Sequence, residues 1–202
     1  MCKLENFRPM YRIILASNSP RRKELLRGIG VEYEVRTLPD VDESYPTDLQ
    51  GGDIPLYIAR EKAQAYRQLL QADELMITAD TIVWHNGRVL GKPNNRQEAI
   101  DMLRSLSAST HQVYTGVALT TDSWQRAFVA ETSVRFAALT DEEVLFYVDH
   151  FRPFDKAGAY GVQEWIGYIG VEYIAGSYFN VMGLPVQRLY QELKSVSAIK
   201  TL

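Results

Sequence analysis

The spacing of hydrophobic residues changes along the chain, and this change predicts which segments form strands and which form helices. Short apolar runs and alternating stretches predict strands over residues 13–16, 33–38, 75–79, 82–84, 89–90, 113–121 and 126–137. Apolar residues three and four positions apart predict helices over residues 20–29, 53–71, 95–107 and 140–149, and from Pro185 onward. Helices alternate with strands early, whereas hairpins dominate the middle. This order predicts an α/β fold with a mixed, partly antiparallel twisted sheet flanked by helices.

Polar residues at the ends of these segments mark several boundaries. Pairs with the spacing of an N-cap and its N3 partner precede two of the predicted helices: Asn95 with Glu98, and Thr140 with Glu143. Asp53 can cap the helix that follows it. Asn86 and Gly87 lie between two short apolar runs and predict a tight hairpin turn.

The composition is that of a soluble globular protein, and it disfavours several functional classes. Of the 202 residues, 46% are hydrophobic and 23% are charged, and the formal net charge of -3 argues against non-specific nucleic-acid binding. Cys2 is the only cysteine, which leaves no intramolecular disulfide and no thiolate metal cluster. The N-terminus lacks the apolar core of a signal peptide, and glycines interrupt the best candidate for a membrane span, residues 165–179. We therefore expect a cytoplasmic protein that binds neither nucleic acid nor membrane.

The segment after the first predicted strand has the features of an anion site. A polar turn that contains Ser17 leads directly into a helix at Pro20, and free backbone N–H groups at a helix start attract anions. Arg21 and Arg22 occupy the first turn of that helix, where the helix dipole disfavours cations. This placement indicates an external anion such as a phosphate chain, although two solvated surface arginines would give the same pattern.

Two acidic residues are candidates for catalysis or metal binding. Asp80 follows a short apolar strand, and α/β folds place their sites at the ends of such strands. A carboxylate there can deprotonate water or hold a divalent cation, but it can equally cap a tight turn. Glu43 lies in an acidic loop and could complete an oxygen-ligand site of the kind that magnesium prefers, or could simply be solvated.

Three further polar residues lie in segments that suit ligand binding. Lys92 follows Gly91, which lets the backbone approach a ligand closely. Lys62 lies on a predicted helix, where a solvated face with ordinary charge pairing is the stronger local interpretation. Gln163 ends a run of small residues, and its amide can both donate to and accept from the edge of a base, although a turn also explains the run.

The histidines do not indicate a zinc site or a hydrolase triad. His85 falls in the predicted hairpin turn, and His111 and His150 lie beside predicted element ends, which makes the three too scattered to share a metal. No serine has a convincing partnership with a histidine and an aspartate.

Taken together, these segments resemble the Maf family of nucleoside triphosphate pyrophosphatases. The resemblance runs from about Arg12 to Leu193 and is carried by the blocks ILASNSPRRKELL, VDES, AREKAQA, ADTIV, GKP, MLRSLS, HQVYTGVAL, LTDEEV, DKAGAYGVQ and GSYFNVMGLP. The blocks SPRR, ADT and DKAGAYGVQ look like the branch that hydrolyses dTTP and UTP. The resemblance implies one Maf-like domain over residues 1–202, with residues 1–10 as an N-terminal extension and two lobes around a nucleotide cleft.

The resemblance also implies a reaction and a set of site residues. Members of the family convert a nucleoside triphosphate and water to the monophosphate and pyrophosphate with a divalent metal, Mg²⁺ or Mn²⁺. By this likeness Asp80 is the proton acceptor, and Glu43 and Asp80 lie at the metal. The positions that set pyrimidine preference match Arg21, Thr81 and Gln163. The positions that line the triphosphate pocket match Ser17, Arg22, Lys62 and Lys92. The family likeness further suggests a homodimer.

Three departures from the family pattern lie close to the expected base pocket. Arg152 stands where an acid is usual, Glu164 stands where a glycine is common, and residues 165–174 form an unusual stretch. A non-catalytic regulator of septum formation and cell division is the alternative function, because the family is also associated with that role. A nucleotidyltransferase would bind phosphates by similar means but would need an acceptor.

Overall fold

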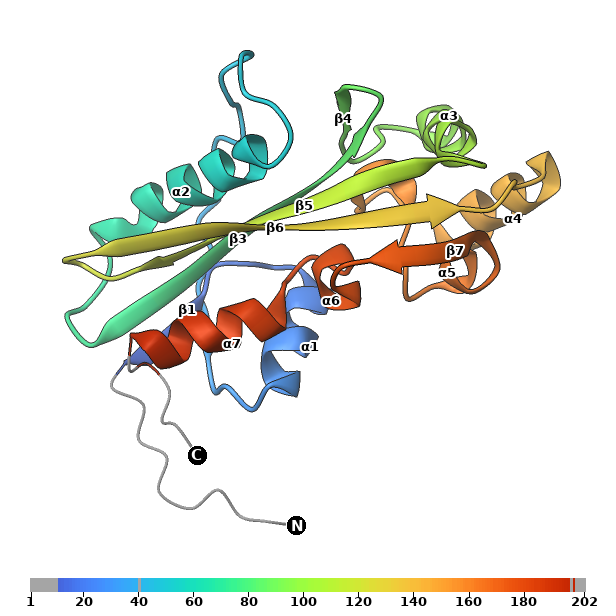
Figure 1. Cartoon of the computed structure of the whole chain (residues 1–202). Helices are drawn as coiled ribbons and strands as arrows, with labels where there is room; N and C mark the ends of the chain where they lie inside the picture. The colour runs from blue at the N-terminus through green and yellow to red at the C-terminus, as the bar shows by residue number, and fades with distance from the viewer. Residues whose placement is uncertain (1–10, 40, 197, 199–202) are drawn as a thin grey trace, which may run out of the picture.

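Within residues 11–39, 41–196 and 198, which the computed structural model describes, seven strands form one mixed sheet (Figure 1). The strands are β1 (Arg12–Leu15), β2 (Glu34–Val35), β3 (Glu74–His85), β4 (Arg88–Leu90), β5 (Thr110–Thr120), β6 (Gln125–Phe136) and β7 (Val171–Ala175). Their order is β2-β1-β3-β5-β6-β7, and β4 also pairs with β3. β1 runs parallel to both of its neighbours, and the other pairs are antiparallel. The predicted N-terminal extension lies outside the described residues.

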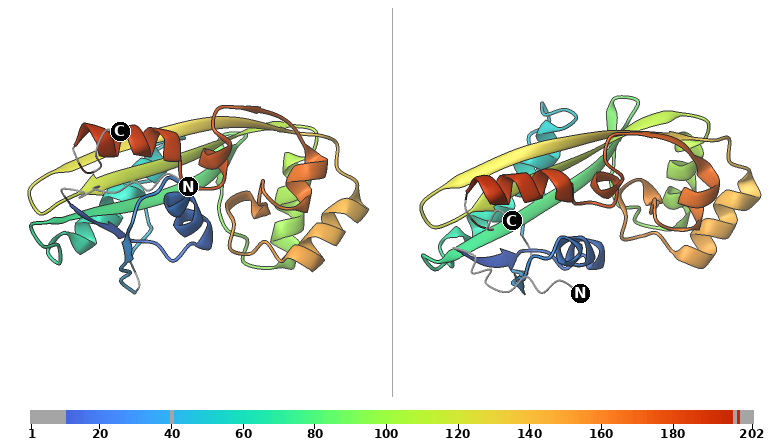
Figure 2. Two further views of the ribbon diagram at one scale, coloured as in Figure 1. Left: turned by 90° about the horizontal axis from the view of Figure 1, so that it is seen from below. Right: turned by 60° about the horizontal axis from the view of Figure 1, so that its bottom comes forward.

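Helices cover both faces of the sheet and gather at one end of it (Figures 1 and 2). They are α1 (Pro20–Gly28), α2 (Asp53–Arg67), α3 (Arg96–Leu106), α4 (Asp141–Phe151), the short 3-10 helix η1 (Ala157–Ala159), α5 (Trp165–Gly170), α6 (Tyr178–Val181) and α7 (Val186–Ser195). α2 lies on one face, α1 and α7 lie on the opposite face, and α3, α4 and α5 surround the end near β4 and β7. The predicted mixed sheet flanked by helices is confirmed.

Two main hydrophobic clusters divide the molecule into two lobes along the long strands. The first lobe packs β1, α1 and α7 against the first half of β3, with Leu26 and Leu189 fully buried. The second lobe packs α3, α4 and η1 against the second half of β3, with Leu103 and Tyr147 fully buried. β3, β5 and β6 run through both lobes and connect them. No helix of the described residues is long and apolar enough to cross a membrane.

Local boundary signals were accurate where a cap or turn decides the structure. Asn95 accepts a hydrogen bond from the Glu98 N–H at the start of α3, and Thr140 forms a full capping box with Glu143 at α4. Asn86 and Gly87 both have positive φ in the turn between β3 and β4. Pro185 directly precedes α7.

Other predicted boundaries were wrong. The predicted strand over 33–38 is only Glu34–Val35, and the helix predicted over 53–71 ends at Arg67. Asp53 is the first residue of α2, but its side chain makes no capping bond, and Gly52 occupies the cap. α5 and β7 were not predicted, because the glycines in their sequence interrupt the spacing of hydrophobic residues that would indicate a helix or a strand.

The most important correction concerns β3, which is one strand of 12 residues. The sequence predicted two short strands interrupted at Asp80 and Thr81. Instead, β5 pairs with β3 continuously from Met76 to Trp84 and keeps both polar residues in register. Asp80 therefore lies in the middle of a strand and not after its end.

β3 is paired along only part of its other edge. β1 pairs with it as far as Ile77, and β4 pairs with it from Val83 onward. In the described residues no strand pairs with that edge over 78–82, between the two lobes. Asp80 and Thr81 lie in this open stretch, and their side chains point to opposite faces because strand residues alternate.

Small residues let α2 approach the sheet closely beside Asp80. Gly116 is the β5 partner of Asp80, and a methyl group there would overlap the backbone of Pro55 in α2. Ala59 and Ala63 of the helix pack on Ala118 of β5. This close packing explains why α2 can deliver a side chain to the open edge of β3.

Replacing Gly116 with alanine is expected to lower the free energy of unfolding by about 1–3 kcal/mol, because overpacking forces α2 and β5 apart. Urea denaturation with and without the substitution measures the loss. Gly87→Ala is a comparison at an open turn, where nothing would contact the added methyl group and only the positive φ is strained. A Gly116→Ala protein as stable as the wild type would show that the helix does not depend on this contact.

Candidate active site

A pocket of about 840 Å³ opens at the unpaired stretch of β3, between the two lobes. Its lining includes all nine residues that the sequence singled out: Ser17, Arg21, Arg22, Glu43, Lys62, Asp80, Thr81, Lys92 and Gln163. A volume of this size accommodates a ligand as large as a nucleotide. The structure thus brings the nine candidate residues together in one pocket.

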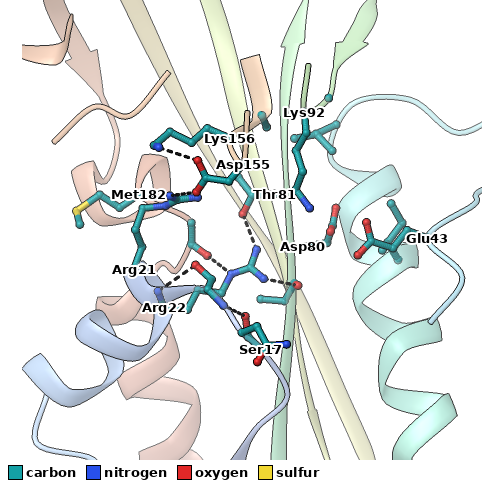
Figure 3. Close-up of a pocket in the computed structure, with 18 of the residues that line it drawn as sticks. Ser17, Arg21, Arg22, Glu43, Asp80, Thr81, Lys92, Asp155, Lys156 and Met182 are labelled. Carbon is teal, nitrogen blue, oxygen red and sulfur yellow. Dashed lines mark hydrogen bonds and ion pairs between the residues drawn. The ribbon is translucent and has the colours of Figure 1, made fainter. Parts of the chain in front are cut away.

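Asp80 and Glu43 share one cation. The Lys62 ammonium lies 2.8 Å from Asp80 Oδ1 and 2.8 Å from Glu43 Oε1. Lys62 and Asp80 have side chains only 14% exposed, so water screens their interaction weakly. Figure 3 shows Asp80, Glu43 and Lys92 with their charged ends directed toward one another.

The cations around Glu43 keep it ionised. Burial by itself raises the pKa of Glu43, but the hydrogen bond and charge of Lys62, with the charges of Lys92 and Arg22, lower it below its ordinary value. Lys62 lies on the sheet-facing side of α2, together with Ala59 and Ala63. The solvated helix face that the sequence favoured for Lys62 is therefore wrong.

The start of α1 has the predicted strand–turn–helix form. The Ser19 side chain accepts a hydrogen bond from the Arg22 N–H as the helix cap, and Pro20 is the first helical residue. Ser17 is buried and its hydroxyl accepts from the Ser19 N–H at 3.2 Å. The turn thus faces the pocket with a polar, ordered backbone.

Arg22 connects α1 to the open edge of β3. Its guanidinium donates to Ala79 O at 2.9 Å, to Thr81 Oγ1 at 3.2 Å and to Gly183 O at 2.9 Å. Burial lowers the pKa of Arg22, but an arginine remains charged in proteins. Three of its five N–H groups are therefore used within the protein, and Arg22 both holds the pocket together and contributes positive charge to it.

Thr81 lies in a chain of polar groups across the sheet. Its hydroxyl is 2.9 Å from the hydroxyl of Thr115, which is 3.2 Å from Asn180 O. Asn180 is fully buried and donates to Val113 O and Thr132 Oγ1. This chain fixes α6 and the following Gly183 against β5, and so places one wall of the pocket.

Arg21 reaches across the mouth of the pocket to the second lobe. Its guanidinium lies 2.8 Å from Asp155 Oδ2, and Lys156 lies 2.7 Å from Asp155 Oδ1 (Figure 3). Burial raises the pKa of Asp155, but the hydrogen bonds and charges of Lys156 and Arg21 lower it to about 2. The ion pair therefore persists throughout the physiological pH range and joins the two lobes.

Residues 12–196 match the protein family described as Maf-like protein. The chain belongs to the Maf family.

Three similar proteins share one name. A Bacteroides fragilis protein named dTTP/UTP pyrophosphatase is 67% identical over 186 residues, which are 92% of this chain and 96% of the relative. The protein of that name from Bacteroides thetaiotaomicron is 66% identical, with the same coverage of 92% and 96%. The Phocaeicola vulgatus protein of that name is 63% identical over 96% of this chain and 100% of the relative. A solved structure titled a HAM1 protein from Coxiella burnetii aligns with 92% of this chain and 100% of its own chain. Its TM-score is 0.49 and its sequence identity is 16%, a likeness too weak to bear on function.

The Maf pocket offers two carboxylates to a cation. In the described residues no group of three or more His, Cys, Asp or Glu side chains could hold a metal. Glu43 and Asp80 nevertheless face the same ammonium, and Mg²⁺ commonly binds through one or two carboxylates with substrate phosphates as its other ligands. These two residues fit a metal that arrives with a triphosphate.

Of the histidines His85 and His111 in the Maf core, the sequence placed His111 correctly beside the end of a strand but placed His85 wrongly in the turn. His85 ends β3 and His111 lies in β5, both are buried, and their rings are 6.5 Å apart. They are therefore not scattered, but they lie within the core of the second lobe. His111 is hydrogen bonded to the Tyr160 hydroxyl at 2.8 Å.

Sequence reasoning missed three charged or polar residues beside the Maf pocket. Asp155 and Lys156 lie in the same block as Gln163, and that shared block was the signal that could have identified them. Tyr147 contacts the Gln163 segment from α4, where its sequence indicates only an ordinary buried aromatic residue. Arg152 is the cap residue of α4 with positive φ, and Glu164 pairs with Lys156 at 3.0 Å.

Proposed function

We propose that this Maf protein hydrolyses dTTP and UTP to the monophosphate and pyrophosphate, and so clears these nucleotides from the cellular pool. The observation that carries the proposal is the shared name of its relatives, dTTP/UTP pyrophosphatase, at 63–67% identity over at least 92% of the chain. The pocket is consistent with that name because it gathers cations around two carboxylates.

In the proposed reaction a water molecule attacks the α-phosphorus. The bond from the water oxygen to phosphorus forms, the bond from the α-phosphorus to the oxygen of the leaving pyrophosphate breaks, and a proton passes to Asp80. Asp80 lies in a weakly solvated position beside Lys62, which holds its carboxylate in place. Asp80 is thus proposed as the general base.

The cations of the pocket are proposed to bind the triphosphate. The leaving pyrophosphate is rich in negative charge, and fixed positive groups stabilise that charge most strongly as it develops. Lys62, Lys92 and the remaining N–H groups of Arg22 are assigned to the phosphates, together with the Ser17 turn. Phosphoryl transfer needs little else from a protein beyond positioning and neutralisation.

We assign a divalent cation, Mg²⁺ or Mn²⁺, to Glu43 and Asp80. When bound, such an ion supplies further neutralisation at the phosphate oxygens. Lys62 would then orient both carboxylates toward it.

We assign base recognition to Arg21, Thr81 and Gln163. The edge of uracil or thymine presents an N–H group between two carbonyl oxygens, and a glutamine amide can pair with one of each. The Gln163 carbonyl oxygen is buried and has no hydrogen-bond partner in the described part of the chain, so it is an unsatisfied acceptor in a residue that lines the pocket.

The family likeness adds a homodimer in the cytoplasm that acts on free nucleotides and not on nucleic acid or membranes. Sedimentation equilibrium of the purified protein tests the dimer directly. A monomer at micromolar concentration would contradict it.

Pyrophosphate release tests the reaction. We would incubate the protein with dTTP, UTP, CTP, GTP or 7-methyl-GTP, with Mg²⁺ or Mn²⁺ and without an acceptor. Formation of monophosphate and pyrophosphate, fastest from dTTP and UTP, supports the proposed reaction and excludes a nucleotidyltransferase. Nucleotide binding without any turnover would contradict hydrolysis and favour the regulator of septum formation and cell division.

Replacing Gln163 with alanine is expected to raise KM for dTTP and UTP, because one group that recognises the base is lost. The ratio of kcat/KM for either of them to kcat/KM for CTP should fall by about tenfold. Initial rates with each triphosphate give the ratio of kcat/KM. Gln97→Ala, on the exposed start of α3, is the matched control and should leave the ratio unchanged. Unchanged ratios in Gln163→Ala would show that the base is recognised elsewhere.

A further inference from the structure

A cluster of buried polar groups surrounds the turn that carries Gln163, and the proposed reaction does not use them. The turn spans residues 161–164 and is closed by a hydrogen bond of 2.9 Å from Glu164 N to Gly161 O. Tyr147 of α4, which is fully buried, lies directly behind it. Lys156, also buried, lies on the other side of the Glu164 carboxylate.

Tyr147 holds the turn at both of its ends. Its hydroxyl accepts a hydrogen bond of 3.0 Å from Gly161 N and donates one to Glu164 Oε2. Burial, together with the hydrogen bond to Glu164, raises the pKa of Tyr147, so the hydroxyl keeps its proton throughout the physiological range. The two residues on either side of Val162 and Gln163 are therefore fixed to one rigid aromatic side chain.

Glu164 is fixed from its other side as well. Its Oε1 lies 3.0 Å from the Lys156 ammonium, and Lys156 also pairs with Asp155, the partner of Arg21. The Lys156 side chain is only 9% exposed, and an ion pair that takes a charge out of water adds little to stability compared with apolar packing of the same volume. The desolvation of Lys156 is more readily explained if these ion pairs fix the geometry of the turn over residues 161–164.

Gly161 provides the surface over which Gln163 folds. A methyl group at Gly161 would lie 2.8 Å from Glu164 Cδ and 2.9 Å from the Gln163 amide nitrogen. The Glu164 carboxylate and the Gln163 amide are therefore both folded close to the same point. A carboxylate attracts the NH₂ side of a neighbouring amide and repels its carbonyl side. This favours an amide whose NH₂ group lies toward Glu164 and whose carbonyl oxygen lies away from it.

The orientation of that amide decides which pyrimidine it accepts. Cytosine presents an acceptor nitrogen where uracil presents an N–H donor, so a glutamine amide rotated by about 180° would match cytosine instead. A glutamine that turned freely would not distinguish the two bases.

We propose that Tyr147, Glu164 and Gly161 are positioning residues that hold the Gln163 amide in one orientation and thereby give the site its preference for uracil and thymine over cytosine. The inference rests on the proposed function, because it assigns the selectivity of the same pocket. None of the three is proposed to touch the reacting atoms.

Tyr147→Phe is the first test, since it removes only the hydroxyl group. We expect the ratio of kcat/KM for UTP to kcat/KM for CTP to fall by about tenfold, as in Gln163→Ala. The value for UTP should fall, whereas the value for CTP should stay the same or rise. A variant that is merely destabilised would lose both activities in parallel. Tyr33→Phe is the matched control, because it removes a phenol hydrogen bond of 2.7 Å to Lys23 O, outside the turn, and should keep the ratio.

Gly161→Ala carries the test if Tyr147→Phe does not fold. The three atoms nearest to the added methyl group belong to the ends of two flexible side chains, so the chain should fold while the Gln163 amide is displaced. The same fall in the ratio is expected.

The two proposals fail in different ways. No turnover of any triphosphate by the wild-type protein would refute hydrolysis, and binding of non-hydrolysable UTP and CTP analogues would then test the positioning by the same ratio. Wild-type hydrolysis without base preference, or a preference that survives both Tyr147→Phe and Gly161→Ala, would overturn the positioning role and leave hydrolysis intact.

Discussion

Asp80→Asn is expected to lower kcat by at least about 100-fold while nucleotide affinity changes little, the usual scale for removing a general base. The asparagine keeps the shape of the side chain and can still accept a hydrogen bond from Lys62, which lies 2.8 Å from Asp80 Oδ1. Its amide oxygen can still serve as an oxygen ligand of the proposed cation beside Glu43, so the variant loses chiefly the ability to take a proton from water. The expected result is therefore a change in the chemical step and not in binding.

Single-turnover measurements of UTP hydrolysis, combined with the affinity for a non-hydrolysable analogue, separate the two effects. Asp73→Asn is the matched control, since Asp73 is an exposed carboxylate just before β3 that pairs with Arg12 at 3.0 Å. It should retain full activity. An Asp80→Asn protein with near-normal turnover would exclude Asp80 as the base and direct attention to Glu43.

Much of the fold follows from signals that act within a few residues. The caps of α3 and α4 and the Asn86-Gly87 turn depend on hydrogen bonds and φ angles that neighbouring residues determine. Because these choices are local, the sequence predicted them correctly. The same holds for the turn between β1 and α1, which the Ser19 cap and Pro20 define.

The candidate site required contacts that no local pattern contains. Asp80 resembles a turn residue in sequence, but pairing with β5 holds it inside a strand, and the open edge beside it exists only because β1 ends before β4 begins. Lys62 looks like a surface residue on a helix until Gly116 lets α2 approach the sheet. The resemblance to a family pointed to residues that the structure gathers in one pocket, but the contacts that bring them together are tertiary.

Within the second lobe, the segment from Gly161 to Gly176 was the least predictable part for the same reason. Tyr147 and Glu164 lie 17 positions apart, and their hydrogen bond depends on how α4 packs beside α5. The glycines of residues 165–176 interrupt both helical and strand periods, although α5 and β7 form there. β7 forms by pairing with β6, a partner that lies more than 30 positions earlier in the chain.

Lys62→Met is expected to reduce kcat/KM for UTP at neutral pH by about 100-fold or more, on the scale of removing one preorganised charge from a phosphoryl-transfer site. The methionine retains much of the apolar stem but leaves Glu43 and Asp80 without the ammonium that lies 2.8 Å from each. Two carboxylates then face each other across a weakly solvated pocket. The variant should bind the phosphates more weakly, and Glu43 should ionise less readily.

The pH dependence distinguishes these two contributions. In the wild-type protein, burial works against ionisation of Glu43, but Lys62, Lys92 and Arg22 overcome it and lower the pKa of Glu43. Without Lys62, burial and the charge of Asp80 would raise the pKa of Glu43. Glu43 would then become protonated at a higher pH, so the acid limb of the kcat/KM profile should move upward and the deficit of the variant should shrink as pH rises.

Profiles of kcat/KM against pH for both proteins test this directly, with thermal unfolding to confirm that the variant is folded. Arg60→Met is the matched control, because it removes a cation from the exposed side of the same helix and should preserve both the rate and the acid limb. A deficit that stays constant at every pH would mean that Lys62 acts on the phosphates alone. A deficit that narrows with rising pH would mean that one ammonium serves two purposes, holding Glu43 ionised and attracting the triphosphate that Asp80 is proposed to hydrolyse.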